Sequence, residues 1–260
     1  AMLKDTAGLS ENDGYQELRH FFESRRKELW LYGPNSLYTY DNDLNRFFFS
    51  KGSNRQVDFI QYGTVYQMME DRDGGIWLAT DNGLYFLNSG GRSWDVKNYF
   101  LSPKEGAAYE ITDILQLQTG EYWLSSWGNG VLTLDRKFQR YEAGIYSRIP
   151  DFNRIRNNQY RQTWTLHQQA NGLIWIGCQA GNYILHNHAT RTSTFHQLRE
   201  AENATIRFIT AGTGNSLWIG TQRGHLIKHD GATFTTVQKF NTIVRKVFID
   251  KQGLIWVALE

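Results

Sequence analysis

The chain has 260 residues, a formal net charge of +2 and a single cysteine, Cys178. The charge is too small to indicate a nucleic acid or an anionic membrane as partner, and one cysteine excludes an internal disulfide and a multi-cysteine zinc site. Aromatic residues make up 15% of the chain, with 24 Gly and only 3 Pro, and this composition favours short strands joined by tight turns.

One pattern centred on Trp recurs six times along the chain. The copies read "KELWLYG", "GGIWLAT", "GEYWLSS", "GLIWIGC", "NSLWIGT" and "GLIWVAL". Successive Trp residues of the pattern lie 47, 46, 52, 43 and 38 residues apart, which is the period of a propeller blade. The six aligned residues are Trp30, Trp77, Trp123, Trp175, Trp218 and Trp256.

Each copy divides into four short strands. An extended segment such as "VYQMMED" precedes the Trp strand, and turns such as "TDNG" or "TQRG" lead from it into a third strand. Four copies have Gly three residues before the Trp, where a tight hairpin requires positive φ. These glycines are Gly74, Gly120, Gly172 and Gly253.

The pattern predicts an all-β protein, a β-propeller with about five complete four-stranded blades and a partial sixth. We expect a single propeller domain over residues 1–260, with each aligned Trp buried as a wedge between blades. No helix is expected near the N-terminus, where "ENDGYQELRHFFESRRKELW" is interpreted as the first strand of the first blade. The expected blades are approximately 15–50, 60–100, 108–142, 160–198, 204–240 and 243–260.

Two copies, "MMEDRDGGIWLATDNGLYFLN" and "VFIDKQGLIWVALE", resemble the two-component regulator propeller repeat. This resemblance implies the periplasmic sensor region of a Bacteroidetes-type hybrid two-component system. Such a protein also carries a sandwich domain, a membrane span, a histidine kinase and a response regulator. The implied function is a non-catalytic sensor that detects an oligosaccharide and signals through domain or dimer rearrangement. The implied partners are other domains of the same sensor or a second copy of the chain, without contact to nucleic acid or membrane by this segment.

The last copy stops after its second strand, which leaves two interpretations open. The chain is either a fragment of a larger propeller, such as a seven-bladed one, or a ring in which residues 1–14 supply an extra edge strand. We favour the fragment.

Candidate ligand-binding residues come from equivalent positions of the repeat. Eleven residues before each aligned Trp, at the expected mouth of the channel, the chain has mostly Arg and aromatic residues. Aromatic planes suit sugar rings, and Arg pairs with carboxylate or sulfate. We therefore expect an oligosaccharide site, with anionic glycans among the ligands to consider. The alternative is that these Arg residues are solvated and pair with acidic residues. With two residues from the turns between second and third strands, the candidates are Arg19, Tyr66, Trp127, Trp164, Arg207, Arg223 and Arg245.

The sequence predicts no catalytic residue, metal site or cofactor. "DRDGG" lacks the later oxygen ligands of a calcium loop and is interpreted as a hairpin turn, and His186 and His188 are expected to be solvated. A glycan-active hydrolase or lyase, or a lectin-like binding module, remains the alternative. The expected channel mouth has no carboxylate, although Glu110 and Asp113 lie close to it in sequence. A scaffold that only packs against other sensor domains is a third interpretation.

Overall fold

The computed structural model describes residues 17–49, 63–89, 94–98, 109–134, 140–141, 158–250 and 252–260. These residues form five four-stranded sheets and one two-stranded sheet of antiparallel strands. The fold is therefore an all-β propeller with five complete blades and a partial sixth, as predicted. None of the described helices has the length and apolar character of a membrane span. The described helices are three short 3₁₀ segments, η3 (Asn158–Arg161), η4 (Gln179–Gly181) and η5 (Arg199–Ala201).

The chain divides into two compact units, residues 1–111 and 112–260. The first unit contains two complete blades, and one apolar cluster joins them: Trp30 and Leu37 of the first blade pack with Met68 and Leu78 of the second. Residues 1–16 lie outside the described residues, so completion of a blade by residues 1–14 stays a prediction. The strands of this unit are β1 (His20–Glu23), β2 (Leu29–Gly33), β3 (Ser36–Asp41), β4 (Arg46–Phe49), β5 (Val65–Glu70), β6 (Ile76–Thr80), β7 (Gly83–Ser89) and β8 (Trp94–Asn98).

The second unit contains three complete blades and the two-stranded sheet. Their strands are β9 (Ile111–Gln116, of which the first residue belongs to the other unit), β10 (Tyr122–Ser126), β11 (Gly130–Leu134), β12 (Arg140–Tyr141), β13 (Thr163–Gln168), β14 (Leu173–Cys178), β15 (Asn182–Asn187), β16 (Thr192–Gln197), β17 (Ile206–Ala211), β18 (Leu217–Thr221), β19 (His225–His229), β20 (Phe234–Lys239), β21 (Val244–Ile249) and β22 (Ile255–Leu259).

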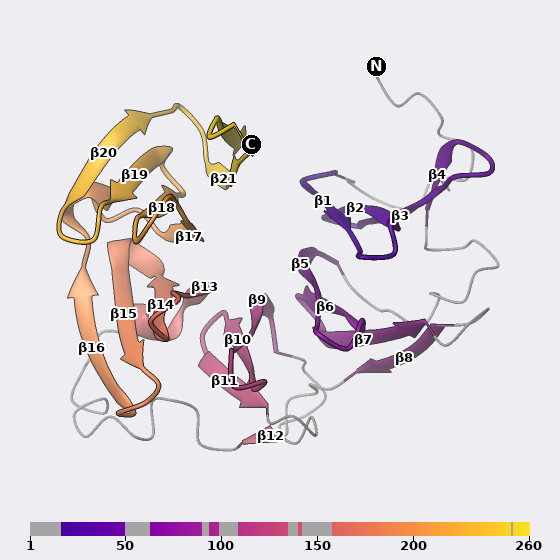
Figure 1. The fold of residues 1–260 in the computed structure, drawn as a ribbon, viewed down its shortest axis with the longest axis horizontal. Coiled ribbons are helices and arrows are strands. Elements are labelled where there is room, and N and C mark those ends of the chain that lie inside the picture. The colour runs from indigo at the N-terminus through magenta and orange to yellow at the C-terminus, as the bar shows by residue number, and fades with distance from the viewer. Residues whose placement is uncertain are drawn as a thin grey trace. The chain divides into compact units, whose positions relative to one another are not determined.

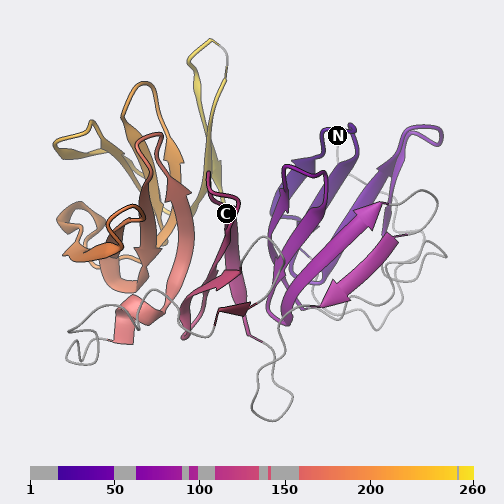
Figure 2. The same cartoon turned by 60° about the horizontal axis from the view of Figure 1, so that its bottom comes forward.

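The first strands of the blades form the inner side of this second unit. In Figure 1, β9, β13, β17 and β21 lie closest together, whereas β12, β16 and β20 lie at the outer ends of their sheets. Contacts between β13 and β17 and between β17 and β21 agree with this arrangement. Figure 2 shows the β21–β22 hairpin, in yellow, as a two-stranded ribbon beside the complete sheets. Side chains of the first strands are therefore placed to face one another.

Five of the six aligned Trp residues are buried, as predicted for wedges between blades. Their exposed fractions are 5% or less, whereas Trp256 is 60% exposed. The prediction is wrong for Trp256 because β22 has no third strand beside it in the described residues. Phe248 and Leu254 of the same hairpin region are also exposed.

Glycine has two separate roles in these blades. The predicted turn glycines, among them Gly74 and Gly172, have φ of +86° and +85°, so the predicted positive φ is confirmed. Gly177 and Gly220, two residues after their Trp, serve packing instead. A Cβ atom on Gly177 would lie 2.7 Å from Ile206, and one on Gly220 would lie 2.7 Å from Val244. The absent side chain thus lets the first strand of the next blade approach closely.

Candidate functional site

Four of the candidate positions are β-bulges in the first strand of a blade. In the second blade Val65 pairs with Thr80 and Gln67 with Ala79, so the strand register skips Tyr66. The same register shift occurs at Trp164, Arg207 and Arg245. A bulge changes the direction of a side chain and often lies beside a binding site. The position eleven residues before the Trp is therefore a bulge in the first strand of these four blades.

Three of the seven candidates come together in the second unit. The ring centroids of Trp127 and Trp164 lie 5.0 Å apart at an interplanar angle of 56°. The guanidinium carbon of Arg207 lies 3.5 Å from the centroid of a Trp164 ring, a cation–π contact. All three side chains are partly exposed. We call these three residues the Trp–Arg cluster; they come from three successive blades.

The other four candidates lie apart from this cluster or are engaged by protein groups. In the first unit, the guanidinium group of Arg19 pairs with Glu17 at 2.7 Å, and the hydroxyl of Tyr66 donates to the Glu110 carboxylate. Arg245 pairs with the Glu260 carboxylate and its side chain is only 9% exposed. The alternative of pairing with acidic residues therefore holds for Arg19 and Arg245.

Arg223 is exposed in the turn between β18 and β19, where its Nη1 donates to the carbonyl oxygen of Glu202 at 3.3 Å. Glu202 also accepts from Lys239 at 2.7 Å and lies 3.2 Å from Nε2 of His225. The Lys239 ammonium, and secondarily His225, lower the pKa of the Glu202 carboxyl. Arg223 thus belongs to a surface network rather than to the Trp–Arg cluster.

Two polar residues missed as candidates, Asp113 and Lys246, lie on the inner side of the second unit. Both are ten residues before an aligned Trp, and Lys246 lies one position after the bulge at Arg245. The carboxylate oxygens of Asp113 accept from the amides of Ile114 and Leu166, each at 2.8 Å, so β9 is bonded to β13 of the next blade. Removal of this carboxyl from water raises its pKa to about 6.

Lys246 is partly buried on β21, and removal of its ammonium group from water lowers its pKa, an effect opposed by the charge of Asp113. No described carboxylate lies within ion-pair distance of Lys246, and its ammonium group makes no hydrogen bond to a described residue. The sequence signal for both residues was the register of the repeat, since both occupy the same position relative to the aligned Trp.

The "DRDGG" segment is the hairpin turn between β5 and β6, as predicted. Asp71 is buried, and its carboxylate accepts from the indole Nε1 of Trp77 at 2.8 Å and from the amides of Gly75 and Asp73 at 2.9 and 3.0 Å. The carboxylate therefore stabilises both the hairpin turn and the position of the buried Trp77 indole. Asp250 repeats the bond to Trp256 at 2.8 Å.

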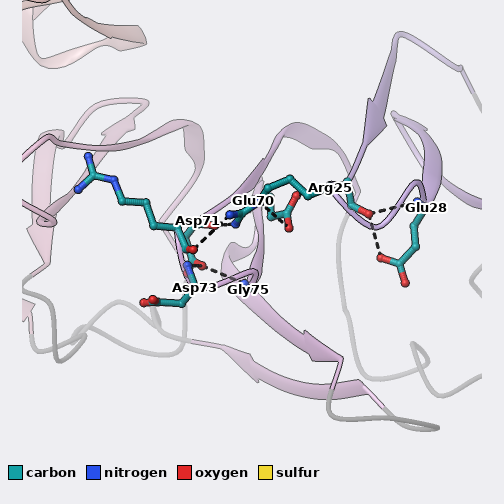
Figure 3. Close-up of polar contacts among 8 residues, drawn as sticks. Arg25, Glu28, Glu70, Asp71, Asp73 and Gly75 are labelled. Atoms are coloured by element: carbon teal, nitrogen blue, oxygen red, sulfur yellow. Dashed lines mark hydrogen bonds and ion pairs between the residues drawn. The ribbon is translucent and has the colours of Figure 1, made fainter.

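This turn also joins the first two blades. Figure 3 shows Arg25, from the turn between β1 and β2, extending to Glu70 and Asp71. The Nε of Arg25 lies 3.1 Å from a Glu70 oxygen, the backbone amide of Arg25 donates to the other oxygen at 2.6 Å, and its guanidinium group donates to the Asp71 carbonyl. Arg25 thus contacts both the carboxylate and the main chain of the neighbouring turn.

Replacing Asp71 with Asn is expected to destabilise the protein by about 1 to 3 kcal/mol, because an amide cannot replace both accepting oxygens of a buried carboxylate. Urea unfolding followed by tryptophan fluorescence measures the loss. Asp43→Asn is the control, since Asp43 is exposed in a turn. If Asp71→Asn lost no more unfolding free energy than Asp43→Asn, the proposed role of Asp71 in stabilising the turn would be contradicted.

The two histidines, His186 and His188, contact protein groups of the second unit. Nδ1 of His186 lies 2.8 Å from the Ser193 hydroxyl, and Nε2 of His188 lies 3.1 Å from a Glu121 carboxylate oxygen. Both rings contact Trp123. The expectation of solvated rings is wrong for His186, which is 5% exposed. Within the described part of the chain, no group of three or more His, Cys, Asp or Glu could hold a metal ion.

Solved structures similar to this chain include extracellular domains of bacterial two-component systems. One, described as part of the hybrid two-component system BT3049 of B. thetaiotaomicron, is 20% identical, with a TM-score of 0.74 over 94% of this chain and 32% of that chain. The corresponding domain of BT4673 from the same organism is 18% identical, with a TM-score of 0.69 over 94% and 33%. This chain therefore spans about a third of those domains.

The same fold also occurs in a structure described as a glucose dehydrogenase from Thermus thermophilus. It is 9% identical, with a TM-score of 0.58 over 94% of this chain and 91% of that chain. At these identities the likenesses establish the propeller fold alone. No curated protein sequence matches the chain.

A family model described as the two component regulator propeller matches residues 60–82, which include β5 and β6 of the second blade. Those residues overlap "MMEDRDGGIWLATDNGLYFLN", the first of the two segments that resemble this repeat. The chain therefore carries the two-component regulator propeller repeat.

Proposed function

We propose that this chain is a non-catalytic, extracytoplasmic sensor propeller of a hybrid two-component system, and that it binds an oligosaccharide at the Trp–Arg cluster. The observation that carries the proposal is the convergence of Trp127, Trp164 and Arg207 from three successive blades. The propeller repeat and the fold of the two extracellular domains support the sensor class. A periplasmic location is part of the same proposal.

The chemistry of the cluster suits a sugar ligand. The C–H faces of a pyranose ring are apolar, and two tilted indole rings offer apolar planes for them. The guanidinium group of Arg207 contacts one indole, and a guanidinium group is a charged donor suited to the hydroxyl or acid groups of a glycan. Because the three side chains are partly exposed, a ligand can reach them without opening the core.

Signalling requires that the ligand binds one arrangement of the sensor more tightly than another. The Trp–Arg cluster joins three blades, so a glycan bound there would contact several blades at once and favour one spacing of them. Other domains of the same sensor, or a second copy, would respond to that spacing. The proposed signal is thus a domain or dimer rearrangement.

A glycan-active enzyme is the second candidate function, and Asp113 is the observation that favours it. A carboxyl with a pKa raised to about 6 can act as a general acid near neutral pH. Glycoside hydrolysis usually requires a second carboxyl opposite the first. Incubation with plant and host glycans, followed by chromatography, separates the candidates: products indicate an enzyme, whereas retained and unchanged glycan indicates a sensor.

The binding proposal is tested with Trp164→Ala and Arg207→Ala on an array of plant and host glycans. Each variant is expected to weaken binding about tenfold or more, because each removes a stacking plane or a charged donor. Calorimetry on the glycan that is retained measures the change.

Arg223→Ala is the matched control, because it removes an exposed Arg outside the cluster. We expect this variant to bind like the wild type. Urea unfolding of all three variants separates a loss of binding from a loss of folding. Unchanged affinity in Trp164→Ala and Arg207→Ala, or no glycan retained by the wild type, would refute the proposal.

A further inference from the structure

Lys246 is a cation on the inner side of the second unit that no described protein group neutralises. It follows Arg245, whose guanidinium group is paired with Glu260. Lys246 is partly buried, and burial lowers its pKa. A partly buried ammonium group without a counter-ion is unfavourable unless something else pairs with it. This is the feature of the second unit that the proposed function leaves unexplained.

Asp113 is the acidic group whose charge reaches Lys246, but its oxygens are engaged elsewhere. They accept from the amides of Ile114 and Leu166 at 2.8 Å, and the hydroxyl of Thr165 also bonds to this carboxyl. Asp113 therefore bonds β9 to β13, and it stays outside ion-pair distance of the ammonium group. No group of the described residues accepts a hydrogen bond from the three N–H donors of Lys246.

Lys246 lies on a strand that packs beside a strand of the Trp–Arg cluster. Asp113 contacts Thr165, and Thr165 directly follows Trp164 on β13. β21 packs against β17, which carries Arg207. Lys246 and two members of the cluster, Trp164 and Arg207, thus lie on strands of the inner side, which Figure 1 shows as β9, β13, β17 and β21.

We propose that Lys246 binds the acid group of a uronic-acid glycan whose sugar rings lie on Trp127 and Trp164. This inference rests on the proposed function and makes it more specific. An anionic group beside Lys246 would supply the missing counter-ion, and a carboxylate accepts a charge-assisted hydrogen bond from an ammonium group. Arg207 adds a second cation, so the site selects acidic over neutral glycans.

The test compares tetragalacturonate with its carboxyl-reduced form, galactotetraose, by calorimetry. The two probes share length and linkage and differ in the acid groups. The wild type is expected to bind the acid probe about tenfold more tightly, because one charge-assisted hydrogen bond is worth about that factor. Lys246→Met should reduce this preference to less than about threefold, and Lys246→Arg should retain it.

Lys239→Met is the control, because it removes a Lys that pairs with Glu202 on the surface; it should keep the preference. Equal binding of both probes by the wild type, or an unchanged preference in Lys246→Met, would overturn the inference and leave the proposed function in place. The same holds if the wild type binds neither probe but retains another glycan on the array. If no glycan binds at all, both proposals fail.

Discussion

Replacing Gly224 with Ala is expected to destabilise the protein by about 3 to 5 kcal/mol, because two costs combine at this position. Gly224 lies in the "TQRG" turn between β18 and β19 with φ of +85°. A Cβ atom there would lie 2.0 Å from the carbonyl oxygen of Phe240 and 2.7 Å from that of Thr242. Both are backbone atoms, and the Gly224 carbonyl accepts from the Phe240 amide at 2.9 Å. The chain cannot move away without losing this bond.

Gly214→Ala separates the two costs. Gly214 also has positive φ, at +63°, but a Cβ atom there would meet nothing within 4 Å. The Gly214→Ala variant should lose only about 1 to 2 kcal/mol of unfolding free energy, the cost of placing a residue with a side chain in a left-handed conformation. The midpoint of urea unfolding, followed by circular dichroism, measures both variants. Similar losses in the two variants would mean that the contact with Phe240 is not rigid.

The repeat made the fold predictable from the sequence. Each Trp with its apolar flanks marks the second strand of a blade, and the glycine before it marks the first turn. The acceptor six residues before the Trp, Asp71 in one blade and Gln169 in another, fixes the indole orientation through bonds of 2.8 Å. These signals are local, since both partners lie within one hairpin, so a single sequence contains them.

The candidate site was only partly predictable, because pairing between distant residues is not visible in one sequence. Counting from the Trp identified the bulge position but could not show that Arg245 is paired with Glu260, fifteen residues later. The contact between Arg207 and Trp164 likewise depends on how two blades pack. Lys246 was missed because the candidates on first strands were taken from the position eleven residues before each Trp, whereas Lys246 lies ten residues before Trp256.

Replacing Trp175 with Ala is expected to destabilise the protein by about 3 to 5 kcal/mol, the usual cost of removing a large buried aromatic side chain. Trp175 is 3% exposed. Its ring stacks on Tyr183 with centroids 5.3 Å apart, and its Nε1 donates to Gln169 at 2.8 Å. Trp175→Phe should cost less, because it keeps much of the apolar contact and loses the hydrogen bond. Urea unfolding of both variants measures the difference.

Trp256→Ala is the informative comparison, because Trp256 has the same bond to the residue six positions earlier, Asp250 at 2.8 Å, but is 60% exposed. The Trp256→Ala variant should lose about 1 kcal/mol of unfolding free energy, mainly because it lacks that hydrogen bond. The two variants therefore differ in burial rather than in local bonding. A loss at Trp256 as large as that at Trp175 would mean that β22 is covered in solution. The partial sixth blade would then be completed by another strand, and its exposed apolar side chains, Phe248 and Leu254, would be buried with Trp256.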